Sequence, residues 1–503
     1  MTEVRLAVDP DQAIGTIDRR LFGSFVEHLG RCVYDGIYEP GHPAADADGF
    51  RTDVMDLVRE LGVTTIRYPG GNFVSGYRWE DGIGPRDQRP TRLDLAWHST
   101  ETNQVGLDEF ALWAERVGAE VMMAVNLGTR GVAEALDLLE YTAIRSGTTW
   151  SDRRIANGRT EPYRFRMWCL GNEMDGPWQV GHRSAAEYGS LAAQAAKAMA
   201  LVDSSVELVV CGSSSSTMPT FGEWERTVLE HTYDDVDLIS CHAYYEPHDG
   251  DIGSFLASPV DMDRFIESVV ATADHVGAVR RSAKRIDISF DEWNVWYNER
   301  FEKVDKITGI DDWPVAPRLL EDSYSVVDAV VVGGLLISLL RHADRVRSAS
   351  LAQLVNVIAP IMTEPGGPAW RQTTFFPFAV TARLARGTVL AARPVSPTYP
   401  TRDHGEVPVV DAVVTQDPDD DRIALFLVNR STDGPATVTV DLSRTGATAV
   451  AECVTLADSD MMARNTLDEP DRVGLIENTS ARLSGGSLTV ELPAVSWTAI
   501  ALE

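Results

Sequence analysis

The chain has 503 residues, which is more than one hydrophobic core usually supports, so we expect two domains. Its 44% hydrophobic and 24% charged residues are ordinary for a globular protein and argue against long disordered segments. A net charge of −30 is repelled by nucleic acid and by anionic membrane surfaces, so we predict that the chain binds neither.

The first three-quarters of the chain alternate between strand-like and helix-like segments. Apolar runs typical of buried strands are at 21–27, 64–69, 121–126, 165–173, 206–211, 236–245, 286–293 and 348–356. Helical periodicity is found between them, at 50–61, 107–117, 133–144, 185–202, 221–231, 260–276 and 326–342. Eight such alternations predict an α/β fold, a (β/α)8 TIM barrel, which we place at residues 19–375.

The pattern changes beyond about residue 375. Short β-like runs at 423–428, 436–442, 488–492 and 497–502 are separated by turns rich in Asp, Gly and Pro, and no convincing long helix intervenes. This favours a C-terminal β-sandwich. The strand-like segment 3–8 could pair with it, so we predict a second domain made of residues 1–18 and 376–503.

The cellular location is predicted from cysteines and apolar segments. The five cysteines are an odd number, widely spaced and without a CxxC pair, which favours reduced thiols in a cytoplasm. No signal peptide is visible at the N-terminus. The most apolar segment, Val326–Leu340, is short and interrupted by a charge, which indicates a core helix and not a membrane span. We therefore expect a cytoplasmic protein.

Two of the predicted barrel strands end in a glutamate. Glu173 follows the apolar run 167–170, and Glu292 follows 286–290, three β/α units later. The carboxyl ends of barrel strands form one shared pocket, and glycoside hydrolysis needs two carboxyl groups at one anomeric carbon. Asp291 is the alternative to Glu292, because neighbours on a regular strand face opposite sides and the pattern does not choose between them.

Other polar residues are expected at the same strand ends. Acids and amides that bind hydroxyl groups, and tryptophans that stack on sugar rings, suit a carbohydrate ligand. Arg67 is a candidate for keeping one carboxylate ionised. His28 and His242 are as readily structural as catalytic. No HxxxH, HExxH or CxxC spacing is present, so we predict no metal site. The remaining candidates at these ends are Glu27, Asn72, Asn126, Asn172, Tyr244, Gln353 and Asn356, with Trp97, Trp178, Trp293 and Trp296 nearby in sequence.

Several stretches together resemble glycoside hydrolase family 51, the α-L-arabinofuranosidases. The Gly-Asn-Glu strand end marks only a large clan of barrel hydrolases, but joined to Gly-Pro-Trp and to Arg-Tyr-Pro-Gly-Gly-Asn it is specific. The matching stretches are Phe22–His28, Arg67–Phe73, Trp79–Gly82, Trp168–Trp178, His242–Tyr245, Asp291–Asn294 and Ala352–Ile358.

This resemblance implies a retaining exo-acting α-L-arabinofuranosidase that releases arabinofuranose from oligosaccharides derived from arabinan or arabinoxylan. It implies Glu173 as general acid/base and Glu292 as nucleophile, and so selects Glu292 over Asp291. It further implies no cofactor and a homohexamer. The implied supporting residues are Arg67 and His242 beside the nucleophile, Glu27, Asn72, Asn172, Tyr244 and Gln353 on the furanose hydroxyls, and Trp97 and Trp296 as pocket walls.

Two alternatives remain open. A related barrel enzyme acting on β-xylosides or β-glucans would use the same pair of acids. A sugar-binding protein that has lost catalysis would keep the pocket, although an intact acid pair argues against it.

Overall fold

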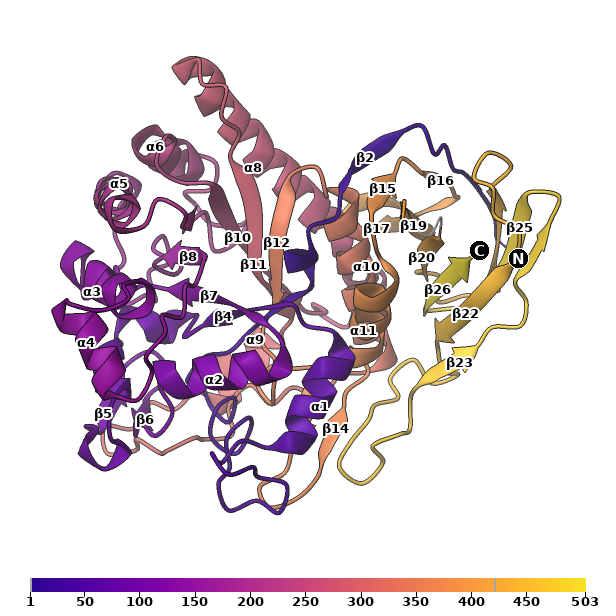
Figure 1. Cartoon of the computed structure of the whole chain (residues 1–503). Helices are drawn as coiled ribbons and strands as arrows, with labels where there is room; N and C mark the ends of the chain where they lie inside the picture. The colour runs from indigo at the N-terminus through magenta and orange to yellow at the C-terminus, as the bar shows by residue number, and fades with distance from the viewer. Residues whose placement is uncertain (1, 420–421) are drawn as a thin grey trace.

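The computed structural model describes residues 2–419 and 422–503, and it contains a barrel and a strand-rich C-terminal domain (Figure 1). Eight parallel strands close the barrel in the order β10-β11-β12-β3-β4-β7-β8-β9. All eight predicted strands are present, so the predicted TIM barrel is confirmed. Their bounds are β3 Gly23–Phe25, β4 Thr65–Tyr68, β7 Glu120–Ala124, β8 Met167–Leu170, β9 Glu207–Val210, β10 Leu238–Tyr245, β11 Asp287–Val295 and β12 Val346–Leu351.

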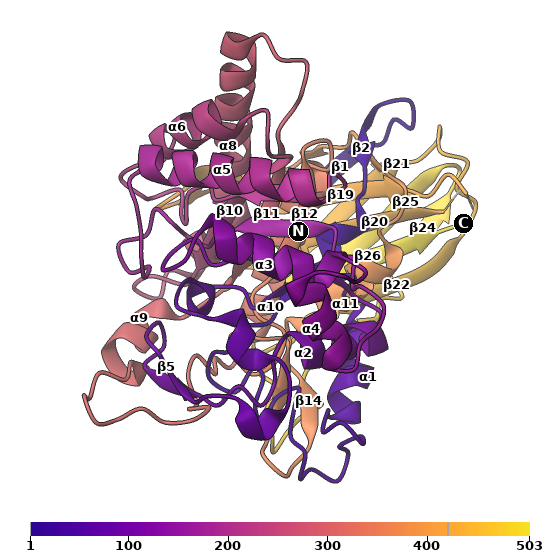
Figure 2. The same cartoon turned by 60° about the vertical axis from the view of Figure 1, so that its left-hand side comes forward.

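Helices follow the barrel strands and cover their outer face (Figures 1 and 2). One of the longer helices, α5, has Ser184 as its N-cap. The Ser184 hydroxyl accepts a hydrogen bond from the Glu187 N–H, and the Glu187 carboxylate accepts one from the Ser184 N–H, so the two residues cap the helix reciprocally. The seven predicted helices are all found, as α1 Thr52–Leu61, α2 Leu107–Val117, α3 Val132–Ala143, α5 Ala185–Val202, α6 Glu223–Thr232, α8 Pro259–Arg280 and α10 Val326–Arg341.

Some elements were not expected. One of them is helix α11, Phe375–Leu384, which lies at the predicted domain boundary and before the first β-like run at 423–428. This segment is apolar almost throughout, so it lacks the periodic polar positions that mark a helix at a surface. The predicted first strand, 21–27, is shortened because Arg19–Phe22 forms a 3₁₀ turn. Further short elements are α4 Thr149–Ala156, α7 Ile252–Leu256, α9 Asn298–Arg300, the π-helix Phe301–Asp305, and the strands β5 Arg92–Asp94, β6 Ser99–Glu101, β13 Ile361–Thr363 and β14 Ala369–Arg371.

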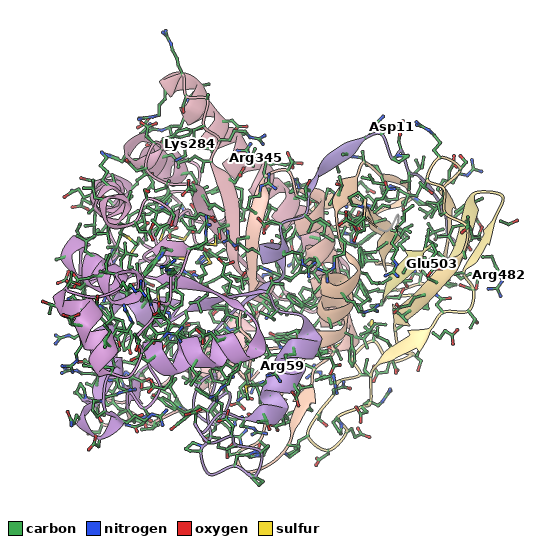
Figure 3. The ribbon with its side chains drawn as sticks, viewed as in Figure 1. Asp11, Arg59, Lys284, Arg345, Arg482 and Glu503 are labelled. Carbon is green, nitrogen blue, oxygen red and sulfur yellow. The ribbon has the colours of Figure 1, made fainter. Side chains whose placement is uncertain are left out.

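The C-terminal domain is a sandwich of two sheets around its own apolar core, and Figure 3 shows the side chains of both domains. The expected partner of the N-terminal strand is confirmed, since β1 (Thr2–Ala7) runs parallel to β21 in register from Thr2↔Ala436 onward. One sheet has the order β16-β1-β21-β25-β24 and the other β2-β15-β19-β20-β26-β22-β23. We propose that residues 1–18 and 376–503 form this domain. The bounds are β2 Ala13–Thr16, β15 Thr388–Leu390, β16 Pro394–Val395, β17 Thr398–Thr401, β18 Gly405–Pro408, β19 Val410–Gln416, β20 Ile423–Asn429, β21 Ala436–Asp441, β22 Val450–Leu456, β23 Leu475–Glu477, β24 Arg482–Ser484, β25 Ser487–Leu492 and β26 Ser496–Leu502.

Helix α10 lies between the barrel and the sandwich (Figure 1). Every residue from Val326 to Leu340 is buried, which explains why the segment is apolar on all sides. A Cβ added to Gly333 would lie only 2.2 Å from Cδ1 of Trp497 on β26, so glycine is needed for this close approach. Among the described residues, no helix is long and apolar enough to cross a membrane.

Candidate active site

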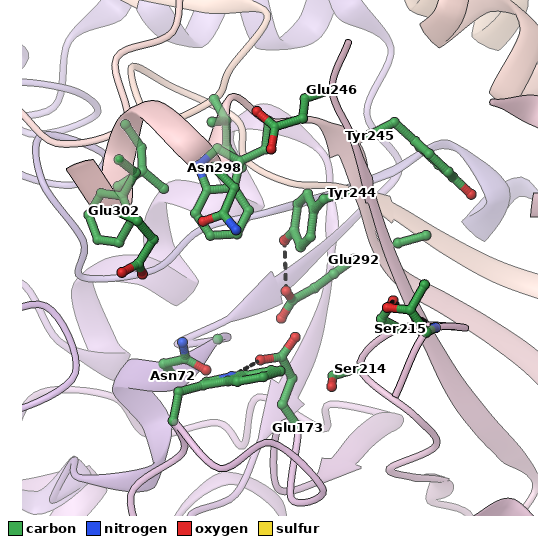
Figure 4. A pocket seen from close by; sticks show the side chains of 18 of the residues that line it. Asn72, Glu173, Ser214, Ser215, Tyr244, Tyr245, Glu246, Glu292, Asn298 and Glu302 are labelled. Atoms are coloured by element: carbon green, nitrogen blue, oxygen red, sulfur yellow. Dashed lines mark hydrogen bonds between the residues drawn. The ribbon is translucent and has the colours of Figure 1, made fainter. Parts of the chain in front are cut away.

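A cavity of about 870 Å³ opens at the carboxyl ends of the barrel strands, where a barrel carries its chemistry. Eight of the eleven site residues expected from the sequence line it: Glu27, Asn72, Trp97, Glu173, Tyr244, Glu292, Trp296 and Gln353. The other three, Arg67, Asn172 and His242, are buried beneath them and hold them in place. Figure 4 shows Glu173 and Glu292 facing each other across the base of this cavity.

Glu292 is held at both carboxylate oxygens. Nη1 of Arg67 donates to Oε1 at 2.7 Å, and the Tyr244 hydroxyl donates to Oε2 at 2.7 Å (Figure 4). Burial raises the pKa of Glu292, and Glu173 adds to this rise, while the charges of His242 and Arg67 and the Tyr244 hydrogen bond oppose it. These three partners therefore favour the ionised carboxylate.

Glu173 stands at a sharp turn after β8. Its backbone is left-handed, with φ of 42°, and Gly171 two residues earlier has φ of 95°, so the chain bends as soon as the strand ends. Oε2 accepts a hydrogen bond of 2.7 Å from the Trp178 indole, and Oε1 lies 2.9 Å from Nδ1 of His242. The side chain is thus fixed from two directions while it borders the cavity.

His242 bridges three carboxyl groups. Its Nδ1 lies 2.9 Å from Glu173 and 3.5 Å from Oε2 of Glu292, and its Nε2 lies 3.0 Å from Oδ1 of Asp291. Burial lowers the pKa of His242, but Glu292, Asp291 and Glu173 outweigh it and raise the pKa to about 10. The imidazole is therefore a cation at neutral pH, placed between the two glutamates.

Asp291 and Glu292 both face the barrel interior, against the expectation for a regular strand. The pairing of β11 with β12 shifts register between Phe290 and Trp293, so the strict alternation of side chains fails at these two residues. Glu292 reaches the cavity, whereas Asp291 is fully buried beside His242 and the Cys169 thiol.

A second set of contacts orients the amides. Oε1 of Glu27 accepts hydrogen bonds of 2.8 Å from the Phe73 N–H and from the Trp97 indole, and Oε2 accepts one of 3.0 Å from Gln353. Asn172 links Arg67 to the amides, because it accepts from Arg67 at 2.7 Å and donates to Asn72 at 3.2 Å. These polar groups form a fixed frame around one side of the cavity.

Aromatic rings form a further part of the cavity wall. Trp296 packs edge-on against Tyr244 with ring centres 5.2 Å apart, and Phe301 lies 6.0 Å from both Trp97 and Trp296. Phe301 belongs to the π-helix of the loop after β11, which the sequence did not place at the site. Apolar faces beside fixed hydrogen-bonding groups match the two kinds of surface that a sugar ring presents.

Glu173, His242 and Glu292 also form the kind of cluster that could hold a metal ion, since one potential ligand atom from each lies within 4.8 Å of the others. Spacing motifs miss such a cluster because its members come from three strands. The Arg67 guanidinium and the charged imidazole already neutralise these carboxylates, which disfavours a cation. The prediction of no metal stays a prediction.

Comparison with known proteins identifies the family. The model "Alpha-L-arabinofuranosidase 1 domain" matches residues 57–252, and "Alpha-L-arabinofuranosidase C-terminal domain" matches residues 291–496. The chain is 60% identical over 510 aligned residues to an exo-α-(1→6)-L-arabinofuranosidase of Bifidobacterium longum, covering 99% of this chain and 97% of the relative. The chain belongs to glycoside hydrolase family 51.

Two further relatives agree with this assignment. An intracellular exo-α-(1→5)-L-arabinofuranosidase of Streptomyces lividans is 59% identical to this family 51 chain. The alignment covers 99% of this chain and 75% of the relative. The solved structure of a family 51 α-L-arabinofuranosidase from B. longum superposes with a TM-score of 0.96 at 51% identity, and each chain is covered completely. The chain is accordingly a glycoside hydrolase.

Some strand-end residues of this family 51 chain serve the fold and do not line the cavity. His28 is held between Glu101, at 2.8 Å, and the Tyr68 hydroxyl, at 2.9 Å. Asn126 and Asn356 hydrogen-bond to nearby loops. Sequence reasoning named Trp178 without a role, although its position five residues after Glu173 was a usable signal. It missed the contribution of Asp403 and His404, which reach the cavity from the other domain.

Proposed function

We propose that this family 51 hydrolase is a retaining exo-acting α-L-arabinofuranosidase, which releases terminal arabinofuranose from neutral oligosaccharides derived from arabinan or arabinoxylan. The observation that carries the proposal is the close approach of oxygens of Glu173 and Glu292, within 4.8 Å. Retaining enzymes have carboxyl groups about 5–5.5 Å apart, whereas inverting enzymes leave about 6.5–9.5 Å for a water molecule.

The first step uses the two glutamates in different protonation states. The Glu292 carboxylate attacks the anomeric carbon, while Glu173 donates its proton to the glycosidic oxygen as the bond to the leaving sugar breaks. Oε2 of Glu173 accepts a hydrogen bond from Trp178, and Oε1 accepts one from His242. A protonated Glu173 can keep both of these bonds and still donate its O–H to the substrate. The product of this step is a covalent ester between arabinofuranose and Glu292.

The second step reverses the proton transfer. Glu173, now ionised, takes a proton from a water molecule, whose oxygen attacks the anomeric carbon and displaces Glu292. Two inversions give retention. Arg67 and Tyr244 stabilise Glu292 as it regains its charge, and the frame of Glu27, Asn72, Asn172 and Gln353 is suited to hold the furanose hydroxyls.

The direct test is a panel of aryl glycosides with the product anomer followed by NMR. We expect rapid hydrolysis of an aryl α-L-arabinofuranoside, with the α-anomer of arabinose appearing first. Faster turnover of an aryl β-D-xyloside or of a β-glucan would favour the alternative barrel glycosidase. Absence of turnover on the whole panel would favour a silent sugar-binding protein.

We also propose a cytoplasmic location and a homohexamer. Relatives named intracellular, from Streptomyces lividans and Bacillus subtilis, support the location at 59% and 51% identity. Cell fractionation of the native host tests the first point, and light scattering of the purified chain tests the second. A monomeric mass would contradict the hexamer.

A further inference from the structure

The cavity extends well beyond the residues that suit a furanose ring. Its outer part is lined by Asp403 and His404, at the tip of the hairpin formed by β17 and β18 in the C-terminal domain. At about 870 Å³ the cavity has room for more sugar than the single terminal pentose that the two glutamates act on. The outer part therefore has room for a further part of the substrate, beyond the terminal pentose.

The hairpin is fixed to the barrel by four hydrogen bonds, one of which joins the Arg402 guanidinium to Asp249 at 3.2 Å. The Tyr399 hydroxyl donates to the Gly253 carbonyl at 3.0 Å, and the Arg402 N–H donates to the Ser254 hydroxyl at 2.9 Å. Arg264 on α8 donates to the His404 carbonyl at 3.1 Å. The hairpin tip is thus held against the loop after β10. Asp403 and His404 border the cavity there, and the Asp403 carboxylate also accepts hydrogen bonds of 2.9 and 3.0 Å from the Arg402 guanidinium.

The facing wall offers hydroxyl and carboxylate groups. Tyr245 donates to Asp261 at 3.1 Å, and Ser216 donates to the same carboxylate at 3.3 Å. In Figure 4 Tyr245 and Ser215 lie on one side of the glutamate pair, and Glu246 and Glu302 on the other. Such side chains bind sugar hydroxyls.

The charge of the cavity restricts the class of ligand. Among the described residues, its lining contains eight carboxyl side chains and, as permanent cations, only Arg264 and Lys306. Even with Glu173 protonated, and with burial raising the pKa of Glu27 to about 8, the carboxylates outnumber these cations. This excess repels uronic acids, so a neutral sugar fits better. Burial lowers the pKa of His404, which leaves an uncharged imidazole at neutral pH that can both donate to and accept from a hydroxyl.

Selectivity for the linkage needs residues outside the furanose frame. Relatives that are 60% and 59% identical to this chain are named for α-(1→6) and α-(1→5) linkages respectively. Both linkages present the same terminal sugar, so an enzyme that distinguishes them must bind the leaving group differently. We propose that Asp403 and His404 form an outer subsite for neutral sugar units on the leaving-group side, so that the sandwich domain contributes to chain-length and linkage selectivity.

This inference rests on the proposed function, and its test compares two substrates on the same enzyme. The full-length Asp403→Ala/His404→Ala variant is assayed on α-(1→5)-linked arabinotriose and on an aryl α-L-arabinofuranoside. We expect the ratio of kcat/KM for arabinotriose to kcat/KM for the aryl substrate to fall about tenfold, mainly through KM, as for one or two lost hydrogen bonds. Arabinobiose should show a smaller fall.

The matched control is Asp433→Ala, an exposed sandwich residue outside the cavity lining, which should leave the ratio as in the wild type. Asp403→Ala alone, at an exposed position, provides a second variant if the double variant does not fold, and its ratio should also fall. An unchanged ratio would contradict the proposed subsite. An equal loss of kcat/KM on both substrates would also contradict it, because that result indicates a hairpin with only a structural role. Wild-type enzyme inactive on both substrates would instead refute the proposed function, and the subsite with it.

Discussion

Oδ1 of Asp291 lies 3.0 Å from Nε2 of His242, although Asp291 precedes the cavity-facing Glu292 on the same strand. The register shift in β11 makes this possible, because it lets both acids face inward. One imidazole therefore touches the buried acid on one side and the two cavity glutamates on the other.

Replacing Asp291 with asparagine should lower the pKa of His242. Asp291 raises that pKa through its charge and its hydrogen bond, so the variant should titrate below the wild-type value of about 10. NMR of histidine-labelled enzyme measures this, with His242→Gln to assign the signal. Ser289→Ala removes only a 3.3 Å contact to Asp291 and is the control. An unchanged pKa in Asp291→Asn would show that the Asp291 charge does not act on the imidazole.

Replacing Tyr244 with phenylalanine should move the acidic limb of the pH profile to higher pH. The hydroxyl hydrogen bond lowers the pKa of Glu292, so its loss raises that pKa, and the carboxylate needed for attack is protonated at higher pH. We expect kcat/KM at neutral pH to fall about 10- to 100-fold, since the lost bond reaches a charged group. A lower rate with an unshifted acidic limb would assign Tyr244 to substrate binding alone.

Replacing Glu173 with alanine should separate the two chemical steps. Aryl substrates with good leaving groups need little acid assistance, so the arabinosyl-enzyme should still form, while its hydrolysis slows by about 10²- to 10⁴-fold. Stopped-flow measurement should show a burst followed by slow turnover. Azide should accelerate the second step and give an α-configured glycosyl azide. An unchanged deglycosylation rate would count against Glu173 as acid/base.

Replacing Gly333 with alanine should destabilise the junction between barrel and sandwich. The added Cβ would overlap Trp497 at 2.2 Å, which we expect to cost about 1–3 kcal/mol despite the better helix propensity of alanine. Thermal unfolding should show a lower Tm. Gly131→Ala at the start of α3 is the control, because its Cβ would meet only a Glu134 oxygen at 3.9 Å. Equal Tm values would mean that Trp497 moves aside without cost.

The sequence predicts what depends on periodicity and misses what depends on irregular backbone. The eight barrel strands and seven helices follow from runs of apolar residues, and Glu173 and Glu292 follow from their positions at strand ends. No residue pattern in the sequence marks the bulge that turns Asp291 inward. The expectation that Asp291 and Glu292 face opposite sides of the strand therefore failed. Helix α11 was missed because burial on nearly all sides removed its amphipathic period. Asp403 and His404 reach the cavity only through domain packing, which no local pattern records.

The central claim, that Glu292 is the nucleophile, is tested most directly by the Glu292→Ala variant assayed with and without sodium azide. Without azide we expect no turnover of an aryl α-L-arabinofuranoside, because no carboxylate attacks the anomeric carbon. With azide in the space left by the side chain, a single inversion should yield a β-configured glycosyl azide, which NMR identifies. Full hydrolytic activity of the variant, or an azide product of α-configuration, would contradict the assignment.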